Sequence, residues 1–342
     1  MTNEPNKPIL KVRGMTTRFR TDRGIVTAVD DVSFDVYPGE TIGIVGESGC
    51  GKTVTSKTIM RLLPERNSII DPNSKIMFEG MNLATASESE MRLVRGDRIA
   101  MIFQEPMTSL NPVFTIGWQI EEALKYHTSL DRSGRRERAI EMLRLVEIPN
   151  PEQRYKEYPH QLSGGMRQRV MIAIALCCEP DILIADEPTT ALDVTIQAQI
   201  LALMAGLKDK LNTSILLITH DLGVVAQVCD RVIVMYAGRV IEEASVFDLF
   251  HRPQHPYSKA LLESIPRVGK KLENGRLPTI PGIVPSLFNL PEGCRFQDRC
   301  EYKSQRCVDH EPCLEPHAFD DRPVRCHTPL NQEVDLTTGA TE

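Results

Sequence analysis

The residues Gly46-Glu47-Ser48-Gly49-Cys50-Gly51-Lys52-Thr53 decide how the rest of this chain is interpreted. They follow the apolar run 41–45 and precede a helical pattern, so a strand, a glycine-rich turn and a helix are expected in succession. In the pattern G-x-x-x-x-G-K-S/T, backbone N–H groups and the helix N-terminus surround phosphate oxygens. Lys52 is expected to contact the outer phosphates, and the Thr53 hydroxyl a Mg²⁺ ion. The alternative is a glycine-rich turn that binds no phosphate. It is disfavoured because the Lys-Thr pair, the preceding strand and the following helix all occur together.

The composition is that of an ordinary folded protein. The chain has 342 residues, of which 41% are hydrophobic and 25% charged. Its net charge of -6, without a basic block, gives no electrostatic reason to expect nucleic acid as a partner. The N-terminus has no apolar segment behind a basic start, so no signal peptide is expected. The most apolar stretch, 170–178, is far too short to span a bilayer, so a membrane role would be peripheral.

Short apolar runs alternate with helical patterns as far as about residue 250. The sequence predicts buried strands at 41–45, 99–102, 182–185, 214–219 and 231–236, and amphipathic helices at 116–127, 135–146 and 195–211. This alternation predicts an α/β fold, with a mixed or parallel sheet and helices on both faces. The first forty residues instead alternate apolar and polar side chains, as at 32–36, and predict a small antiparallel sheet beside the main one.

The texture of the sequence changes after Phe250, where prolines become frequent and helical periodicity nearly stops. We therefore expect a nucleotide-binding domain at 1–250, with a helical subdomain at about 105–180. A small loop-rich module should follow at 251–330, too short of apolar residues to build much core of its own. Residues 331–342 are expected to form a flexible tail.

The second half of the expected phosphate site lies at the ends of neighbouring strands. The run 182–185 delivers Asp186 to the edge where open parallel sheets bind ligands, so Asp186 is expected in the Mg²⁺ shell, through water. Glu187 follows at once and is expected to orient or deprotonate a water. Gln104 follows the predicted strand 99–102 and is expected to contact Mg²⁺ or the attacking water, and His220, at the end of the strand 214–219, is expected to contact the terminal phosphate. Each of these residues would be unremarkable without the phosphate loop upstream.

A second anion-binding turn occurs in Leu-Ser-Gly-Gly-Met-Arg-Gln-Arg at 162–169, where glycines open a helix. One nucleotide cannot easily use two such turns of a single chain. A head-to-tail dimer, in which Ser163, Gly164 and Gly165 contact the nucleotide of the partner chain, resolves this.

The order of these motifs resembles the ATPase domain of ABC transporters from about residue 8 to residue 250. The matching segments are the phosphate loop, Phe-Gln-Glu-Pro at 103–106, the 162–169 motif, Ile-Leu-Ile-Ala-Asp-Glu-Pro at 182–188, Thr-Ala-Leu-Asp at 190–193 and Thr-His-Asp at 219–221. The resemblance implies a P-loop ABC-type ATPase fold that binds ATP and Mg²⁺.

The resemblance also implies a role for each site residue. Residues 46–53 would form the Walker A site. Asp186 would be the Walker B aspartate, Glu187 the catalytic glutamate, Gln104 the Q-loop glutamine and His220 the switch histidine. Ser163, Gly164 and Gly165 would be the signature contact in trans, and Asp193 the D-loop aspartate that links the two sites. Phe19 lies where the family places an aromatic side chain that stacks on adenine, although a core Phe on a strand fits the position nearly as well.

Two further segments resemble one branch of this family. The residues after Gln104 are similar to the loop of peptide-importer ATPases that receives the coupling helix of the membrane subunits. Arg-Pro-Gln-His-Pro-Tyr-Ser-Lys at 252–259, and the C-x5-C-x6-C spacing further on, resemble the C-terminal extension of oligopeptide and dipeptide importer ATPases.

This branch implies a peripheral ATPase at the cytoplasmic face of the inner membrane that powers peptide import. Its partners would be a second ABC ATPase subunit (a paralogue in a heterodimer), two permease subunits and an extracytoplasmic substrate-binding protein. Importers of nickel, glutathione or sugars use similar machines and remain alternatives. An exporter ATPase, or a soluble ABC ATPase outside transport, are further alternatives, although the latter usually carries a coiled-coil insertion or a second ATPase domain.

Five of the nine cysteines crowd into the C-terminal segment, which without a secretion signal favours metal binding over disulfides. Cys294, Cys300, Cys307 and Cys326 are predicted to bind one metal centre, and thiolates suit either iron–sulfur or zinc. The close C-x2-4-C pairs of structural zinc sites do not occur, and the resemblance implies a [4Fe–4S] cluster. Cys313 is interpreted as a non-ligand, although it could replace Cys326. Reduced thiols that pack a small core are the remaining alternative.

Overall fold

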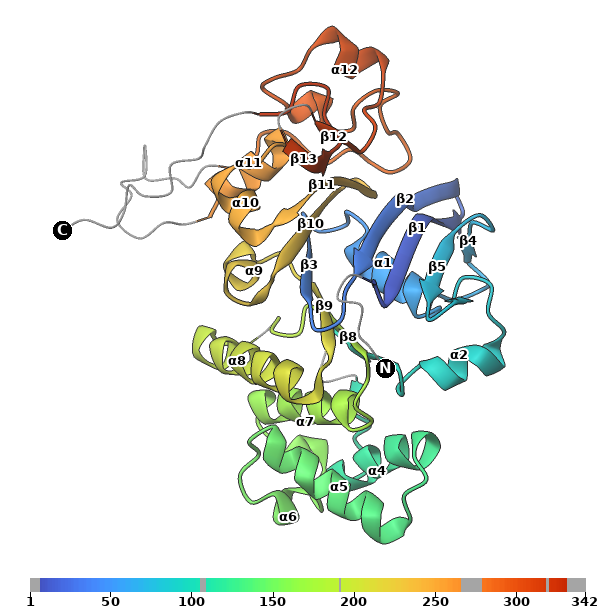
Figure 1. The fold of residues 1–342 in the computed structure, drawn as a ribbon, viewed down its shortest axis with the longest axis vertical. Helices are drawn as coiled ribbons and strands as arrows, with labels where there is room; N and C mark the ends of the chain where they lie inside the picture. The colour runs from blue at the N-terminus through green and yellow to red at the C-terminus, as the bar shows by residue number, and fades with distance from the viewer. Residues whose placement is uncertain (1–6, 105–108, 191, 266–278, 318–319, 331–342) are drawn as a thin grey trace, which may run out of the picture.

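The computed structural model describes residues 7–104, 109–190, 192–265, 279–317 and 320–330 (Figure 1). A helical subdomain lies at one end of the molecule and the C-terminal residues at the other, with the sheets between them. In the described part of the chain, no helix has the length and apolar character needed to cross a membrane.

The main sheet is mixed, as the sequence predicts. Within the described residues it has eight strands in the order β12-β13-β11-β10-β3-β9-β8-β7. Its centre is parallel and consists of β10 (Arg231–Tyr236), β3 (Thr41–Val45), β9 (Ser214–Ile218), β8 (Ile182–Asp186) and β7 (Ile99–Ile102). Every residue of β3, β8 and β9 is buried, because parallel strands covered on both faces need continuous apolar runs.

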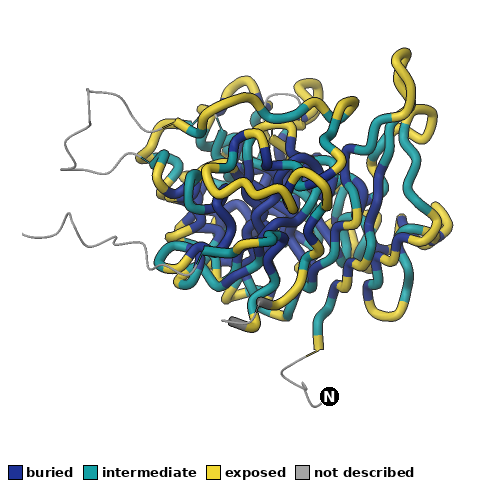
Figure 2. Tube along the Cα trace, turned by 90° about the horizontal axis from the view of Figure 1, so that it is seen from above, coloured by how far each residue is buried: buried dark blue, intermediate teal, exposed yellow. Residues whose placement is uncertain are grey.

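Helices and a second sheet cover the two faces of the main sheet. Successive residues of β8 point to opposite faces, so Leu183 and Ala185 enter one apolar cluster and Ile182 and Ile184 another. The first cluster includes residues of α7 (Gly164–Leu176) and α8 (Val194–Leu211), and α9 (Leu222–Val228) adds Val224. The second includes residues of α1 (Lys52–Ile59) and α2 (Glu88–Val94). Figure 2 shows these buried segments gathered in the middle of the molecule.

The predicted antiparallel sheet is confirmed. Among the described residues it contains β1 (Leu10–Thr21), β2 (Gly24–Val36), β4 (Ser68–Ile70), β5 (Lys75–Phe78) and β6 (Met81–Asn82). In β2 the side chains of Val32, Phe34 and Val36 are buried and those between them are more exposed, as period-two alternation requires.

The helical subdomain contains α4 (Ile116–His127), α5 (Arg132–Leu145), α6 (Pro151–Arg154) and the 3₁₀ turn η1 (Pro159–Gln161), followed by α7. Helix α5 begins at Arg132, three residues before the expected start at residue 135. The reason is Asp131, whose carboxylate accepts a hydrogen bond from the Gly134 N–H at 2.8 Å and caps the helix.

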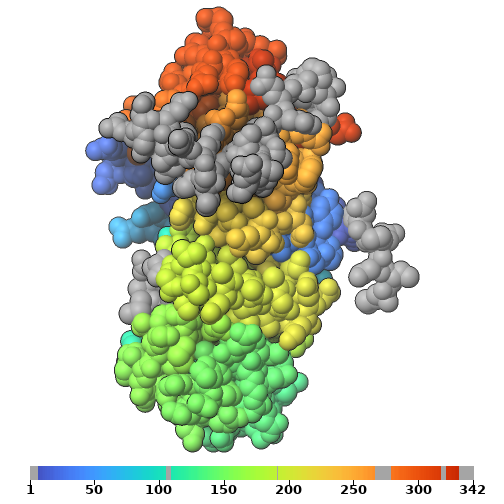
Figure 3. Space-filling model, turned by 90° about the vertical axis from the view of Figure 1, so that its left-hand side faces the viewer, coloured from blue at the N-terminus to red at the C-terminus, as the bar shows by residue number. Residues whose placement is uncertain are grey.

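The segment after residue 250 builds its core jointly with the main sheet. It contains α11 (Pro256–Glu263), η3 (Gln297–Arg299), α12 (Gln305–Asp309), β12 (Glu315–His317) and β13 (Asp320–Val324), and it follows β11 (Arg239–Ser245) and α10 (Val246–His251). Strand β13 pairs with β11, and Tyr257, Leu262 and Phe296 share an apolar cluster with the main sheet. Figure 3 shows the C-terminal residues, in orange and red, capping the end of the molecule opposite the green helical subdomain.

One buried carboxylate helps to fix this C-terminal segment. Glu242 of β11 is fully buried and accepts hydrogen bonds from the backbone N–H groups of Gln254 at 2.7 Å and His255 at 2.9 Å. These N–H groups belong to the two residues that directly precede α11, and His255 is the N-cap of that helix. The carboxylate therefore joins the strand to the segment that leads into the helix.

Candidate functional site

The loop 46–53 connects β3 to α1 in a conformation that requires glycine. Gly46, Gly49 and Gly51 have φ values of 151°, 80° and 105°. A Cβ atom at Gly46 would lie 2.2 Å from the Met235 carbonyl oxygen, and one at Gly51 2.7 Å from that of Ala28. No side chain caps α1, so its first N–H groups stay directed at the curl of the loop.

Lys52 lies inside this curl. Its side chain is 6% exposed, and its ammonium group donates to the carbonyl oxygens of Gly46 at 2.7 Å and Glu47 at 3.1 Å. Cys50 is buried beside it, while Ser48 and Gly49 are exposed at the rim. This arrangement is the one that backbone binding of a phosphate chain requires, with one fixed positive charge among the donors.

The two residues predicted to serve Mg²⁺ lie against each other. The Thr53 hydroxyl donates to Asp186 Oδ1 at 3.1 Å, although the residues come from different elements. Burial raises the pKa of Asp186, and the hydrogen bond from Thr53 works against that rise. A hydroxyl and a carboxylate at one point are oxygen donors of the kind that Mg²⁺ prefers, so the residues present fit the ion.

The carboxylate of Glu187 is the meeting point of the other predicted catalytic residues. Its Oε2 accepts from Gln104 Nε2 at 3.0 Å and from Thr190 Oγ1 at 2.9 Å, and its Oε1 lies 3.2 Å from His220 Nδ1. Gln104, Glu187 and His220 follow β7, β8 and β9, whose carboxyl ends share one edge of the sheet. Three separate motifs of the sequence thus come together at one point.

The surroundings of Glu187 favour its charged form. Burial by itself would raise the pKa of this carboxyl, but hydrogen bonds from Thr190 and His220 bring the pKa below its ordinary value. The backbone of Glu187 is left-handed, with φ at 48°, which is uncommon for a residue with a side chain. Thr190 is a contact that sequence reasoning missed, and its only signal is its place three residues after Glu187.

The turn expected to act on a partner chain is open to solvent. Ser163 caps α7 by accepting from the Met166 N–H at 3.3 Å, and Ser163 and Gly164 are exposed. A Cβ atom at Gly164 would meet nothing within 4 Å, whereas one at Gly165 would lie 3.0 Å from Ile196 Cγ2. Asp193 is also exposed and caps α8 through the Ile196 N–H at 3.0 Å.

Phe19 lies in β1, half-buried, between Val26 of β2 and Ser68 of β4. Its contact with adenine stays a prediction. Residues 105–108 of the loop after Gln104 lie outside the described part of the chain, as does the tail 331–342.

The four thiols predicted to bind one metal do not form such a site as they lie. Among the described residues, no group of three or more His, Cys, Asp or Glu side chains is arranged to hold a metal ion. Cys294 and Cys300 pack against the apolar cluster around Tyr257, and Cys307 Sγ lies 3.4 Å from Ser304 Oγ. Cys326 lines a hollow beside Cys313 and lies within electrostatic range of the other three thiols.

Burial acts in the same direction on three of these thiols. It raises the pKa of Cys294 to about 11 and that of Cys326 to about 12, and it raises the pKa of Cys300 as well. The backbone holds two of them together, since the Cys294 N–H donates to the Cys307 carbonyl at 2.8 Å.

Comparison with known proteins decides the family. The family described as "ABC transporter" matches residues 29–190, and "Oligopeptide/dipeptide transporter, C-terminal region" matches residues 241–307. A probable peptide ABC transporter ATP-binding protein of Sinorhizobium fredii is 55% identical over 308 residues, which are 90% of this chain and 91% of that protein. This chain belongs to the ATP-binding proteins of ABC transporters.

Other members of the ABC family agree in sequence and in fold. The dipeptide transport ATP-binding protein DppD of Bacillus subtilis is 54% identical over 299 residues, covering 87% of this chain and 88% of its own. The dimeric ATP-binding cassette MJ0796, bound to ADP and Pi, superposes with a TM-score of 0.61 at 29% identity, over 69% of this chain and 98% of its own. For cbiO1 from Clostridium perfringens the TM-score is 0.60 at 26% identity, and the match covers 72% of this chain and 91% of cbiO1. The chain is therefore an ABC-type ATPase.

Proposed function

We propose that this ABC ATPase hydrolyses ATP at the loop 46–53 to power the import of di- or oligopeptides at the cytoplasmic face of the inner membrane. The convergence of Gln104 and His220 on Glu187, beside the Thr53–Asp186 pair, carries the catalytic part of the proposal. The peptide cargo is supported by the names of the relatives and by the match of residues 241–307.

In this mechanism a water attacks the terminal phosphoryl group in line with the departing ADP. Mg²⁺, when bound beside Thr53 and Asp186, neutralises charge on the phosphates. Lys52 and the N–H groups of the loop stabilise the charge on the phosphate oxygens. The ionised carboxylate of Glu187 accepts the proton of the water.

The contacts of Glu187 bear on how a water would reach its Oε2, which already accepts two hydrogen bonds, whereas one contact is described for Oε1. Both carboxylate oxygens are already engaged by neighbouring side chains. A water that approaches Oε2 must replace one donor, and Gln104 is the exposed one, at the end of an adjacent strand. We propose that Gln104 turns from the carboxylate to the water or to Mg²⁺ as ATP binds, while Thr190 continues to hold Glu187.

The active unit in this proposal is a dimer with a related ABC ATPase, arranged head to tail. The exposed turn at Ser163, Gly164 and Gly165 would face the nucleotide of the partner, and Asp193 would link the two sites. The open space at Gly164 supports a contact supplied by another molecule. The dimeric form of the related cassette MJ0796 supports the same arrangement. A heterodimer with a paralogue is favoured here, as the resemblance implies.

The membrane partners in this proposal are two permease subunits, served by an external substrate-binding protein. The exposed apolar side chains on both sides of residues 105–108 support a docking face for a permease helix. Phe103 is 41% exposed, Val113 70% and Trp118 41%, and Phe114 stacks on Trp118 at a centroid distance of 3.8 Å. Aromatic side chains of this kind are enriched where proteins bind one another.

For the C-terminal cysteines we propose a [4Fe–4S] cluster on Cys294, Cys300, Cys307 and Cys326, with Zn²⁺ as the alternative. The donor chemistry supports either metal centre, and the thiols would have to turn toward one another to bind it. Protein purified without oxygen should be brown if the cluster is present, and colourless with one zinc per chain if the alternative holds.

The function is tested by transport. The chain is co-expressed with the permeases and the related ABC ATPase encoded nearest to it, purified, and placed in vesicles with ATP inside, and labelled peptide and the substrate-binding protein are added outside. ATP-dependent peptide uptake that is lost in Glu187→Gln is the expected result. Uptake of nickel, glutathione or a sugar in place of peptide would refute the proposed peptide substrate but not the transport function. Failure to associate with any membrane subunit would overturn the transport proposal.

A further inference from the structure

We infer that the C-terminal segment holds the phosphate loop in its binding conformation through Arg299 and Tyr257, which grip Glu47 from outside the nucleotide-binding fold. The inference rests on the proposed ATP site at residues 46–53 and adds positioning residues to it. Neither Arg299 nor Tyr257 belongs to any nucleotide-binding motif of the chain.

The first contact is an ion pair between residues 252 positions apart. Arg299 Nη1 lies 2.6 Å from Glu47 Oε2, and Nη2 lies 3.0 Å from Oε1, so the guanidinium group binds both carboxylate oxygens. The side chain of Arg299 is 4% exposed, and that of Glu47 is 29% exposed. A paired, largely buried fork of this kind fixes direction as well as charge.

The guanidinium group is itself held firmly. Its Nε donates to the Pro281 carbonyl oxygen at 2.9 Å, and its carbon lies 5.8 Å from the ring centre of Tyr236 and 5.9 Å from that of Phe296. These contacts fix the orientation of the guanidinium group that binds Glu47.

The second contact is made by Tyr257 of α11. Its hydroxyl accepts a hydrogen bond from the Glu47 N–H at 2.9 Å. The residue is fully buried, and its ring packs on Tyr236 and Phe296 at centroid distances of 4.7 and 5.4 Å. The C-terminal segment thus binds both the side chain and the backbone of Glu47.

Glu47 in turn contacts the side chain of Lys52, so its position affects that of the lysine. Its third polar group, the carbonyl oxygen, accepts from Lys52 Nζ at 3.1 Å. A rotation of the peptide at Glu47 would therefore move the ammonium group that is proposed to meet the outer phosphates. Arg299 also neutralises a carboxylate that would otherwise stand next to the phosphate loop and repel the nucleotide.

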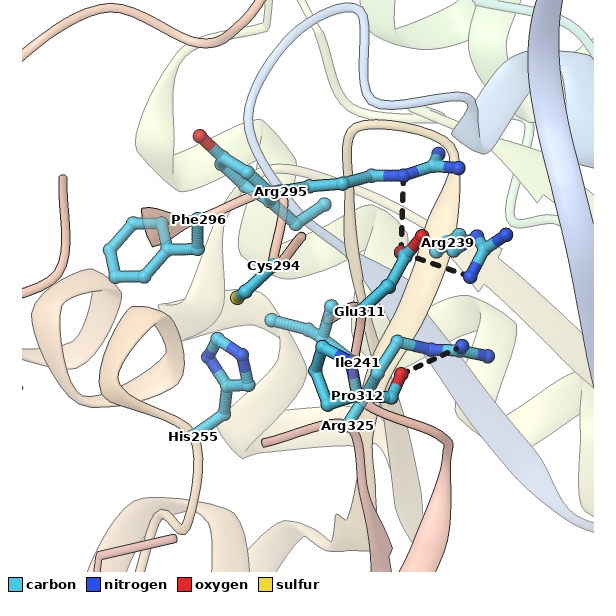
Figure 4. Close-up of a pocket in the computed structure, with 10 residues that line it drawn as sticks. Arg239, Ile241, His255, Cys294, Arg295, Phe296, Glu311, Pro312 and Arg325 are labelled. Carbon is cyan, nitrogen blue, oxygen red and sulfur yellow. Dashed lines mark hydrogen bonds and ion pairs between the residues drawn. The ribbon is translucent and has the colours of Figure 1, made fainter. Parts of the chain in front are cut away.

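A second set of ion pairs keeps the turn that carries Arg299 against the ATPase fold. Figure 4 shows Arg295 and Arg239 directed at the carboxylate of Glu311, with nitrogen–oxygen distances of 3.3 and 2.9 Å. Arg295 also donates to the Ala237 carbonyl oxygen at 2.6 Å. The next residue, Gly238, donates to the Cys50 carbonyl oxygen at 2.9 Å, within the phosphate loop.

The test measures ATP affinity in the full-length chain, by equilibrium binding of a fluorescent ATP analogue. Arg299→Gln should weaken binding about tenfold, because it leaves the Glu47 carboxylate unpaired in a largely buried place. Glu47→Gln combined with Arg299→Gln should recover part of the affinity, since no unpaired charge remains, but should stay about threefold or more weaker than the unaltered chain, because the fork that positions the loop is still missing. Arg306→Gln, in exposed α12 of the same segment, is the matched control and should change nothing.

A change at Tyr257 covers the case in which Arg299→Gln fails to fold. Tyr257→Phe keeps the buried ring and removes only the acceptor for the Glu47 N–H, so it should weaken binding about three- to tenfold with little change in the unfolding temperature. An Arg299→Gln chain that is folded and binds within about twofold of normal would overturn the inference. So would a double variant that binds ATP like the unaltered chain, because Arg299 would then act only by neutralising the Glu47 charge and not by positioning the loop.

The proposed ATP site is judged separately. Lys52→Ala that still binds the analogue normally would refute the site itself. Lys52→Ala that loses binding, while the Arg299 and Tyr257 variants bind normally, would refute only the role of the C-terminal segment.

Discussion

Replacing Glu187 by Gln is expected to remove hydrolysis and preserve ATP binding. The substitution keeps the size of the side chain and takes away its charge. Gln also meets the same left-handed backbone, at a φ of 48°, so it adds no new backbone strain. Lys52 and the loop 46–53 make no hydrogen bond to the Glu187 side chain among the contacts described, and so ATP should bind as before.

The size of the effect follows from the contacts of this carboxylate. It accepts from Gln104 and Thr190 and meets His220, and these neighbours hold its pKa below the ordinary value. An amide cannot accept the proton of the attacking water. General-base catalysis contributes about 100- to 10,000-fold to a rate. We therefore expect turnover to fall by that factor, which corresponds to about 3 to 5 kcal/mol of barrier.

The assay compares phosphate release at saturating ATP with equilibrium binding of ATP, in the assembled transporter. Glu179→Gln is a matched control, because Glu179 also has a left-handed backbone, with φ at 54°, lies in an ion pair with Arg138, and precedes β8, whereas Glu187 follows it. It should hydrolyse ATP normally. Turnover by Glu187→Gln within about twofold of normal would refute the assigned role. A loss of binding like that expected for Lys52→Ala would show that Glu187 supports the phosphate site and not the water.

Three further changes test the contact in trans, a buried histidine and the cysteine cluster. Gly164→Asp should leave folding and ATP binding of this chain intact, because the added Cβ meets nothing within 4 Å, and should abolish hydrolysis in the dimer; an active dimer would contradict the proposed contact in trans. His255 is neutral when folded, since burial lowers its pKa to about 3 while its ring accepts from the Tyr257 N–H. Its contribution to stability is complete above its unfolded pKa of 6.5 and is lost as the pH falls toward 3, so the unfolding temperature of His255→Gln should fall less between about pH 7 and 5 than that of the unaltered chain. Cys300→Ser should lower the iron or zinc content of protein purified without oxygen, and an unchanged metal content would remove Cys300 from the ligand set.

Much of the fold could be predicted because buried parallel strands have a simple sequence pattern. The strands at 41–45, 99–102 and 231–236 occur where continuous apolar runs place them. The C-terminal strand β13 could not be found this way. Its sequence, Asp-Asp-Arg-Pro-Val, has no alternation, and it lies between the edge strand β12 and β11, with which it pairs through Val324 and Glu242.

The candidate site likewise contains contacts that the sequence predicts and contacts that it does not. Gln104, Glu187 and His220 could be expected to meet, because each follows a strand and neighbouring parallel strands bring their carboxyl ends to one edge. The contact between Arg299 and Glu47 had no such signal. The chain has 40 Lys and Arg residues and 46 Asp and Glu residues, and nothing in the sequence marks which of them pair across 252 positions. The metal centre stays a prediction, because the spacing of the cysteines predicts four ligands whose side chains are not arranged as a metal site in the described part of the chain.

The C-terminal segment and the phosphate loop are joined closely enough that deleting the segment would be a poor test of its role. The rings of Tyr257 and Phe296 cover Tyr236 of the main sheet, so a chain ending near residue 250 would expose that apolar surface as well as the Glu47 carboxylate. A loss of ATP binding in the truncated chain would then have two explanations. Tyr257→Phe separates them, because it keeps the apolar cover and removes a single oxygen atom that accepts the Glu47 N–H. If the segment acts on ATP binding only by protecting the core, this variant should bind ATP normally; if it positions the loop, binding should weaken while the core stays intact.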